Sequence, residues 1–462
     1  MMQFFKTYRL EILIFALALA ARLLYFGVSF QVNGGDILDT VTGPDGYTTV
    51  SKNLIEGHGL TSAGAPSYEP YSFRPPLYHF FIAGGYFALG GYWGVILLQM
   101  LLGSLVPLLG MRVAAYLTRG RALLAALGVF LALEPSGVLY STFFYSETLF
   151  TVLFLAGVWA FFAYLKEAEA STRFLTASAL ILGLATLTRP TTQFLPILFA
   201  AVFLWTRRHE LFSRRTLLPV VLYAAIFVAT LSPWLVRNYI LFGVAGLSPQ
   251  TGVNLYTTLL PTVYSIDRGT TFQQEFAAQR EAGIPGPNEA VITDGAKDMA
   301  LAVPLLLEHP RALLYSALNS TWSFFVLDGM YDFFRHINVR PREVIGKPSV
   351  IALFSDPGAV AGYLYRNIFG LVGWIVLARL CWIAIAAAFV AGAWRYLRAN
   401  ANLYAVLTLL IVAYFLLTSL ITGFGLTARY RLPVNVFVIT FALCEVAAVA
   451  PWLMQKVRRF HA

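Results

Sequence analysis

The sequence predicts an all-α polytopic membrane protein with about ten, and at most twelve, transmembrane helices. Composition is the first reason: 58% of the 462 residues are hydrophobic and only 12% are charged, whereas a soluble protein carries about 25% charged residues. The second is that several apolar runs exceed the roughly 18 residues that span a bilayer. The third is that most lysines and arginines lie in short connectors between these runs, as the positive-inside rule requires.

The net charge of +10 does not indicate a nucleic-acid-binding protein. Its basic residues are spread over membrane connectors instead of forming one patch. Two cysteines, Cys381 and Cys444, both fall in apolar runs, so they are expected to be buried thiols and not a disulfide.

The first predicted span runs from Leu10 to Phe30, behind Lys6 and Arg9. It has no small-residue cleavage site, so we expect a retained helix and not a signal peptide. Arg22 lies inside this span and must either snorkel to the interface or face the protein interior.

A polar first outer loop, Gln31 to Tyr92, follows the first span. Within it Tyr47, Val50 and Leu54 recur at helical spacing, which predicts a short amphipathic helix on the membrane surface that ends at Gly57.

Nine further spans are predicted, and with the amino terminus in the cytoplasm every inner connector is short and basic. Arg379 falls inside the eighth span, and the sixth span is short for a full crossing. The nine spans are Trp93–Leu117, Ala122–Leu139, Thr148–Leu165, Phe174–Thr188, Phe194–Trp205, Leu217–Val236, Asn367–Trp394, Leu403–Thr422 and Pro433–Met454.

The pattern of spans and loops divides the chain into three parts. Residues 1–236 form an amino-terminal transmembrane module that contains the first outer loop, 31–92, in which the candidate site residues described below begin. Residues 237–366 form a small extracytoplasmic domain, and residues 367–462 form the carboxy-terminal transmembrane helices. Helices are expected in the extracytoplasmic domain at Thr271–Ala282, Glu289–Leu307 and Arg311–Phe325.

Two acids on the outer side are candidate catalytic residues. Asp45 lies between Gly43 and Gly46, where it could cap the following helix. The flanking glycines, however, would also let a substrate approach the backbone. Glu147 opens the fourth span, a position that the helix dipole favours whether or not the residue is catalytic. Glu134, before Pro135, is a weaker third candidate.

Arginines also gather on the outer side. Arg74 precedes Pro75-Pro76, which can start a helix, and four more arginines stand at span ends, where the positive-inside rule disfavours them. One such arginine could be an ordinary interface residue, but several on one face suggest an anion, most simply a phosphate, because a guanidinium fork matches phosphate oxygens. The four are Arg189, Arg237, Arg429 and Arg431.

The order of these motifs resembles the C-type (GT-C) integral-membrane glycosyltransferases, and most closely the bacterial relatives of protein O-mannosyltransferases and of the lipid A aminoarabinose transferase. The resemblance extends from Leu10 to about Ala450. The motifs in order are Asp45-Gly46-Tyr47, Phe73-Arg74-Pro75-Pro76-Leu77-Tyr78, Ser146-Glu147-Thr148-Leu149-Phe150, Thr188-Arg189-Pro190, Pro233-Trp234-Leu235-Val236-Arg237-Asn238-Tyr239 and Arg429-Tyr430-Arg431-Leu432-Pro433.

This resemblance implies that a sugar is transferred from a polyprenyl phosphate to an extracytoplasmic hydroxyl with inversion. Asp45 takes the position of the first-loop base, with Glu147 as a second catalytic candidate. The leaving polyprenyl phosphate would be stabilised by Arg74, Arg189, Arg429 and Arg431. The predicted substrate pocket contains Tyr47, Glu69, Tyr78, Arg237, Asn238, Asn254, Tyr256 and Tyr430.

No essential metal or other cofactor is expected, although some members of the superfamily use a divalent ion. An oxygen-seeking metal needs several carboxylates or carbonyls, and only Asp45 and Glu147 are placed to contribute. The expected partners are the lipid-linked sugar, membrane lipids and an acceptor that is a glycolipid, a glycan or a protein. The family subgroup implies a bacterial inner membrane, with both termini cytoplasmic and the active site on the periplasmic side.

Two other functions compete with this interpretation. A transporter or lipid flippase would show inverted repeats and charges at mid-membrane, and only Arg22 and Arg379 fit that description. A scaffold or receptor-like protein would leave the outer arginines unexplained.

Overall fold

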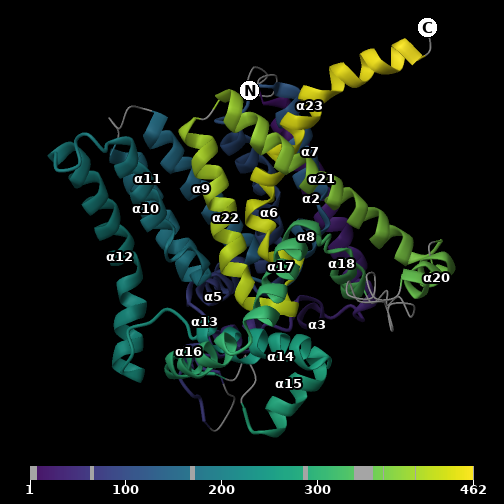
Figure 1. The fold of residues 1–462 in the computed structure, drawn as a ribbon. Coiled ribbons are helices and arrows are strands. Elements are labelled where there is room, and N and C mark those ends of the chain that lie inside the picture. The colour runs from purple at the N-terminus through teal and green to yellow at the C-terminus, as the bar shows by residue number, and fades with distance from the viewer. Residues whose placement is uncertain are drawn as a thin grey trace.

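The computed structural model is helical, and its long apolar helices form one bundle (Figure 1). The structure describes residues 8–62, 67–166, 172–284, 290–337, 357–367, 369–400 and 402–460. No strand occurs in these residues apart from one isolated bridge between Thr61 and Pro70.

Seven of the described helices are long and apolar enough to cross a membrane. All of them coincide with predicted spans, and the polytopic all-α class is confirmed. They are α2 (Arg9–Val32), α6 (Tyr92–Ala114), α9 (Glu147–Lys166), α12 (Arg214–Phe242), α21 (Leu371–Asn400), α22 (Leu403–Ser419, extended by η4, Leu420–Gly425) and α23 (Asn435–Phe460).

Four further helices are apolar but shorter: α5 (Leu77–Leu89), α7 (Arg121–Leu133), α10 (Thr172–Thr188) and α11 (Leu195–Thr206). Three of the four coincide with predicted spans. The fourth, α5, was predicted as part of a polar loop, and that prediction was wrong. Its sequence is apolar apart from the buried His79, and Pro76 stands at its amino-terminal cap, where a proline costs no helical hydrogen bond.

The third predicted span is also corrected, because the helix is broken in two. Helix α7 ends at Leu133, and the short α8 (Pro135–Leu139) follows. Pro135 has no amide hydrogen to continue the helical ladder. The Glu134 carboxylate accepts a hydrogen bond of 2.6 Å from the Gly137 amide instead, so Glu134 acts as the cap of α8.

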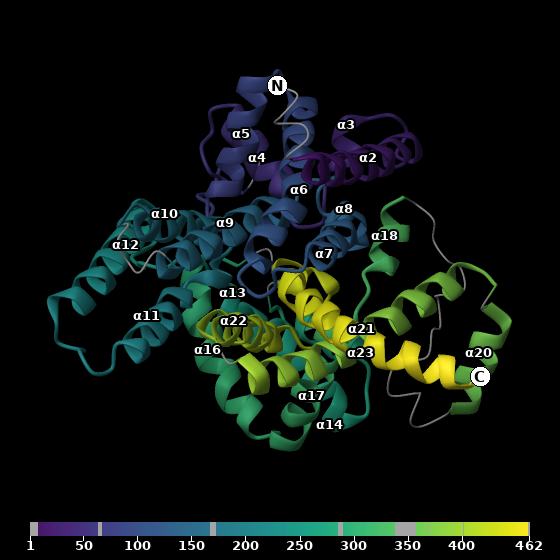
Figure 2. The ribbon, with the colours of Figure 1, turned by 90° about the horizontal axis from the view of Figure 1, so that it is seen from above.

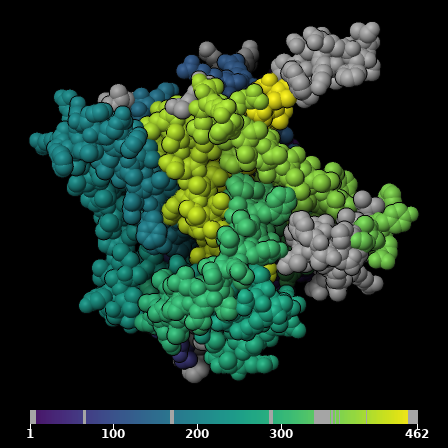
Figure 3. All heavy atoms as spheres, viewed as in Figure 1, coloured from purple at the N-terminus to yellow at the C-terminus, as the bar shows by residue number. Residues whose placement is uncertain are grey.

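The segment between α12 and α18 (Met330–His336) gathers at the end of the bundle that lies away from both chain termini (Figure 1). Its side chains cover the lower face in the space-filling view (Figure 3). The predicted helices agree closely with α15, α16 and α17. The segment contains α13 (Gln250–Asn254), the π-turn η2 (Leu255–Leu259), α14 (Leu260–Arg268), α15 (Phe272–Glu281), α16 (Ile292–Leu307) and α17 (Pro310–Val326).

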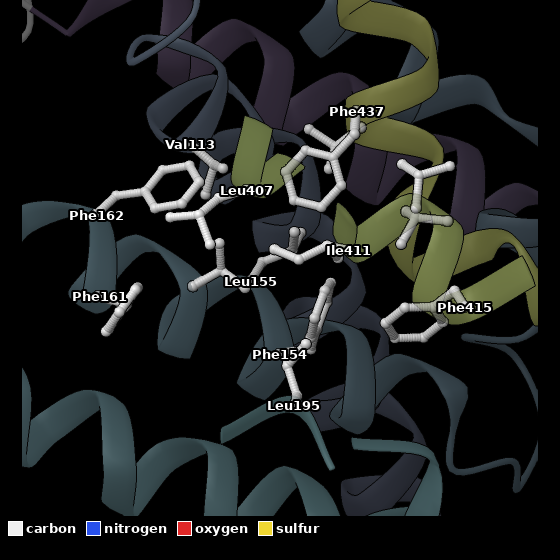
Figure 4. Close-up of a cluster of buried hydrophobic side chains, with 14 of the residues drawn as sticks. Val113, Phe154, Leu155, Phe161, Phe162, Leu195, Leu407, Ile411, Phe415 and Phe437 are labelled. Carbon is white, nitrogen blue, oxygen red and sulfur yellow. The ribbon is translucent and has the colours of Figure 1, made fainter. Parts of the chain in front are cut away.

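Seen along the bundle, α11 and α12 extend to one side of the molecule, while α20 (Pro357–Asn367) and α21 extend to the other (Figures 1 and 2). Between them lies the main apolar core, which joins α9 and α10 to α22 and α23. Figure 4 shows Phe154 of α9 beside Phe415 of α22, whose ring centroids are 5.0 Å apart in an edge-to-face arrangement.

Small residues allow α9 and α10 to approach closely. A Cβ atom on Gly157 would lie 2.6 Å from Cγ of the buried Leu182, and Ser178 donates a 2.9 Å hydrogen bond to the Gly157 carbonyl. Without a hydrophobic driving force inside the bilayer, such close backbone packing and interhelical hydrogen bonds hold helices together.

We therefore expect Gly157→Ala to lower the thermal stability of the purified protein, because the added methyl group overpacks the α9–α10 contact at a cost of about 1–3 kcal/mol. Gly84→Ala is the matched control: Gly84 is an exposed helical glycine with nothing within 4 Å of the added Cβ. Unfolding temperatures in detergent check this expectation. Equal temperatures for the two variants would contradict the close packing.

Candidate functional site

A cavity of about 470 Å³ lies where the first loop, the start of α9, the turn after α10, helix α13 and the segment between α22 and α23 meet. Eight of the predicted site residues line it: Asp45, Tyr47, Arg74, Glu147, Arg189, Asn254, Arg429 and Tyr430. Helix α13 lies toward the end of the bundle opposite the two termini (Figure 1), so the cavity opens near that end.

Asp45 precedes α4 (Tyr47–Ile55) but does not cap it. Gly46 stands at the cap with a φ of 74°, a left-handed conformation that glycine adopts without strain. The Asp45 side chain is thereby free to face the cavity. Its Oδ2 accepts a 3.1 Å hydrogen bond from Nη1 of Arg429 and lies 3.6 Å from Nη1 of Arg74.

The two arginines control the ionisation of Asp45. Burial alone would raise the pKa of this carboxyl, but the charges of Arg429 and Arg74 outweigh burial and lower the pKa to about 2. The same attraction keeps Arg429 charged: burial would lower its pKa, but Asp45 raises it well above the usual value.

Arg74 is fixed by the two prolines behind it and by aromatic rings beside it. Nη1 donates to the backbone carbonyl of Asp45, and the guanidinium carbon lies 4.8 Å from the centroid of the Tyr47 ring. The Tyr47 hydroxyl in turn donates a 2.9 Å hydrogen bond to Ser146, next to Glu147. These contacts connect the first loop to the start of α9.

Glu147 is the first residue of α9, and only 1% of its surface is exposed. Oε1 accepts a hydrogen bond from Nη1 of Arg189 and lies 3.8 Å from Nε of Arg429. Within the described part of the chain, Oε2 has no hydrogen-bond partner. Arg189 follows α10 directly in an extended conformation before Pro190, and this conformation turns it toward Glu147.

The cavity thus contains three guanidinium groups and two carboxylates, and these charges sum to +1. Buried charges are tolerated when each has an oppositely charged partner. The excess positive charge gives the site a preference for an anion, and arginine suits the oxygens of a phosphate.

Neutral polar groups form the rest of the wall, together with aromatic and aliphatic side chains. Hydroxyl and amide groups can donate to and accept from sugar hydroxyls. Sequence reasoning missed most of these residues, although Thr418 and Ser419 stand out as hydroxyls at the end of an apolar span. The missed polar residues are Thr191, Gln193, Thr258, Thr418, Ser419 and Thr422, whereas Thr188, Gln250 and Thr251 belong to segments that the sequence pattern singles out.

Three of the other predicted pocket residues lie outside the cavity and contact the protein itself. Tyr78 is buried, and its hydroxyl donates a 2.6 Å hydrogen bond to Gln99. Nη1 of Arg237 donates to the Tyr71 carbonyl at 2.8 Å, which ties α12 to the first loop. Asn238 donates to the Gly246 carbonyl at 2.8 Å.

Three more predicted residues also do not line the cavity. Glu69 is exposed in the first loop. Tyr256 packs beside the apolar cluster of the segment after α12. Arg431 is buried, with only 1% of its surface exposed. Its guanidinium contacts two backbone carbonyls and the ring of Trp382.

Few candidate metal ligands lie together in the described part of the chain. Among the residues described, no three histidine, cysteine, aspartate or glutamate side chains cluster. The two carboxylates that line the cavity are each held by arginines, and a hard cation needs several oxygen ligands that are not already engaged by positive charges.

The chain is similar to known proteins both in sequence and in fold. Residues 73–236 match the sequence profile of the family described as dolichyl-phosphate-mannose-protein mannosyltransferase. No curated protein matches the chain significantly. An oligosaccharyltransferase of Archaeoglobus fulgidus, crystallised with a tethered acceptor peptide, is similar with a TM-score of 0.50 and 11% sequence identity, over 98% of this chain and 51% of that chain.

A second solved structure, ArnT from Cupriavidus metallidurans bound to undecaprenyl phosphate, gives a TM-score of 0.38 and 16% identity over 96% of this chain and 80% of that chain. The chain spans about half the length of the archaeal oligosaccharyltransferase. The predicted GT-C glycosyltransferase fold is confirmed.

The Glu147–Arg189 pair supplies a test of the site's electrostatics. We expect Arg189→Gln to lower the free energy of unfolding by up to about 3–5 kcal/mol, because it leaves the buried Glu147 carboxylate with only the more distant Arg429 as a cationic partner. Glu147→Gln combined with Arg189→Gln should recover most of this loss. Unfolding of the two single variants and the double variant in detergent measures the coupling. Additive losses would show that the two side chains do not interact.

Proposed function

We propose that this protein transfers a sugar from a polyprenyl-phosphate donor to an acceptor hydroxyl with inversion of configuration. The observation that carries the proposal is the cavity at one end of an apolar bundle, where Arg74, Arg189 and Arg429 meet Asp45 and Glu147. The matched family is named for dolichyl-phosphate mannose, a lipid-phosphate sugar, which agrees with a site that attracts a phosphate.

The donor phosphate would bind to the arginines. The phosphate ester leaves as a stable anion, so cations assist its departure more than an acid would. The apolar part of the donor needs contact with lipid, and the cavity wall includes Phe194, at the start of α11, with 56% of its surface exposed. The neutral hydroxyls and amides of the wall would hold the sugar.

Asp45 would act as the general base. A hydroxyl is too weakly acidic to attack unaided, so a positioned carboxylate must take its proton. The acceptor oxygen then forms a bond to the anomeric carbon on the face opposite the phosphate, while the bond from that carbon to the phosphate oxygen breaks. The products are the glycosylated acceptor, protonated Asp45 and polyprenyl phosphate. Glu147 would hold Arg189 in place.

The acceptor would be a glycolipid, a glycan or a protein outside the cytoplasm. Short basic connectors support an orientation with both termini in the cytoplasm and the cavity on the outer, periplasmic side of a bacterial inner membrane. Residues 31–92 would then form the catalytic outer loop of the amino-terminal module, and residues 237–366 an extracytoplasmic domain.

Arg22 and Arg379 are the two arginines that fit a transporter, and each of them forms polar contacts with the protein itself. Nη1 of Arg22 donates to the carbonyls of Ala18 and Ala132, at 2.9 and 3.2 Å. Arg379 forms an ion pair of 2.5 Å with Asp328. Both side chains therefore contact groups of the bundle itself, which weakens the case for charges along a transport path.

Asp45→Asn should reduce donor turnover by more than about a hundredfold, because the amide cannot accept the acceptor's proton. The measurement is release of polyprenyl phosphate by purified protein in nanodiscs, with a panel of polyprenyl-phosphate sugars and acceptors. Asp39→Asn, an exposed aspartate in the same loop, is the matched control and should keep wild-type turnover. Near-normal turnover by Asp45→Asn would remove Asp45 from the chemistry and make Glu147 the candidate base.

We further expect turnover to continue at the wild-type rate after dialysis against EDTA, since arginines and not a metal would neutralise the leaving phosphate. Turnover is measured before chelation, after chelation, and after Mg²⁺ or Mn²⁺ is added back. Loss of activity that either ion restores would contradict this expectation and would identify a metal-dependent transferase.

A further inference from the structure

Arg431 differs from the arginines of the cavity because its hydrogen bonds and its ring contact are with the protein interior. Its Nη1 and Nη2 donate hydrogen bonds of 2.6 Å each to the carbonyls of Phe324 and Leu327. Its Nε donates to Oδ1 of Asn435 at 2.8 Å, and the guanidinium lies 3.5 Å from the centroid of the Trp382 ring. The whole fork is therefore engaged.

The two carbonyls belong to the end of α17, where a helix leaves carbonyl groups without intrahelical partners. A cation at a helix carboxyl terminus is also favoured by the helix dipole. Arg431 both donates to the unpaired carbonyls and places a positive charge at the end of the helix. Because its guanidinium donates to three fixed acceptors, these hydrogen bonds also hold the backbone of Arg431 in place.

That backbone carries Arg429. Between the end of α22 and the start of α23 the chain forms only short 3-10 turns, η5 (Ala428–Tyr430) and η6 (Leu432–Val434). Its backbone hydrogen bonds are local, such as the Arg431 amide to the Ala428 carbonyl at 3.2 Å. Such turns have poorer hydrogen-bond geometry than an α-helix, so the side-chain contacts of Arg431 are the strong link to the neighbouring helices.

We propose that Arg431 is a positioning residue, which clamps this segment onto α17 and so holds Arg429 against Asp45. This inference rests on the proposed function for its effect on turnover, but its structural part does not. Only Tyr430 separates the two arginines along the chain, and Arg429 faces the cavity while Arg431 faces the interior. Arg431 would act through Arg429 and would not contact the donor.

The test uses Arg431→Lys in the full-length protein. Lysine keeps the positive charge but has a single ammonium group, which cannot reach three separate acceptors in the planar geometry of the guanidinium. Arg379→Lys is the matched control, because Arg379 is a second arginine that lies at the end of α17, where it forms an ion pair with Asp328, next to Leu327. Both variants retain their charge, which favours a folded protein.

Hydrogen exchange of the backbone amides in residues 425–432 is the first measurement. We expect faster exchange in Arg431→Lys and wild-type exchange in Arg379→Lys. Unchanged exchange in Arg431→Lys, or an equal increase in both variants, would overturn the positioning role. This measurement needs no substrate, so it decides the structural part even if no donor is consumed.

The second measurement is the pH dependence of donor turnover. A displaced Arg429 would no longer lower the pKa of Asp45 as far in the free enzyme, so the acidic limb of the kcat/KM profile should move to higher pH in Arg431→Lys, with kcat reduced by about tenfold to a hundredfold. A merely structural role would lower the amount of folded enzyme without moving the limb. Failure of the wild-type protein to consume any donor would instead count against the proposed function.

Discussion

The ion pair between Asp45 and Arg429 joins residues that are 384 positions apart in the chain. It closes the cavity by bringing the first loop against the segment between the last two long helices. Neither the first loop nor the segment before α23 could hold its charged residue there without the other, because an unpaired charge in a buried site is strongly unfavourable. The irregular segments at this end of the bundle are therefore held together by the same charges that give the site its chemistry.

Two further hydrogen bonds hold the first loop in place beside the cavity. Ser248 donates a 2.6 Å hydrogen bond to the Phe73 carbonyl, next to Arg74, and Arg237 holds the Tyr71 carbonyl. On the apolar side Phe415 belongs both to the core and to the cavity wall, so the packing of α22 against α9 sets one wall directly (Figure 4). A rigid helical core thus supports a site built largely from turns, as is common for functional loops on a scaffold.

The sequence predicted the helical class, the apolar spans and most of the cavity's charged residues, because apolar length and the side of the membrane are both readable from a linear pattern. It could not predict which way a side chain points within a turn. Arg429 and Arg431 look equivalent in sequence, yet only Arg429 lines the cavity. Helix α5 was missed because it lies inside residues 31–92, which the polar residues on its amino-terminal side led us to interpret as one outer loop, and Gln193 because a lone amide near a span end carries no signal.

The low pKa of Asp45 has a consequence for the proposed reaction. A carboxylate whose pKa is held below its usual range by two arginines is a weak base, since proton transfer is most effective when the pKa of the base is near the working pH. Arg429 and Arg74 cause this low value, and they are also the groups that a donor phosphate would attract. A phosphate that drew these guanidinium groups away from Asp45 would raise its pKa and strengthen the base. On this argument the donor must bind before the acceptor loses its proton, and the ion pairs protect the resting enzyme from activating a hydroxyl when no donor is present.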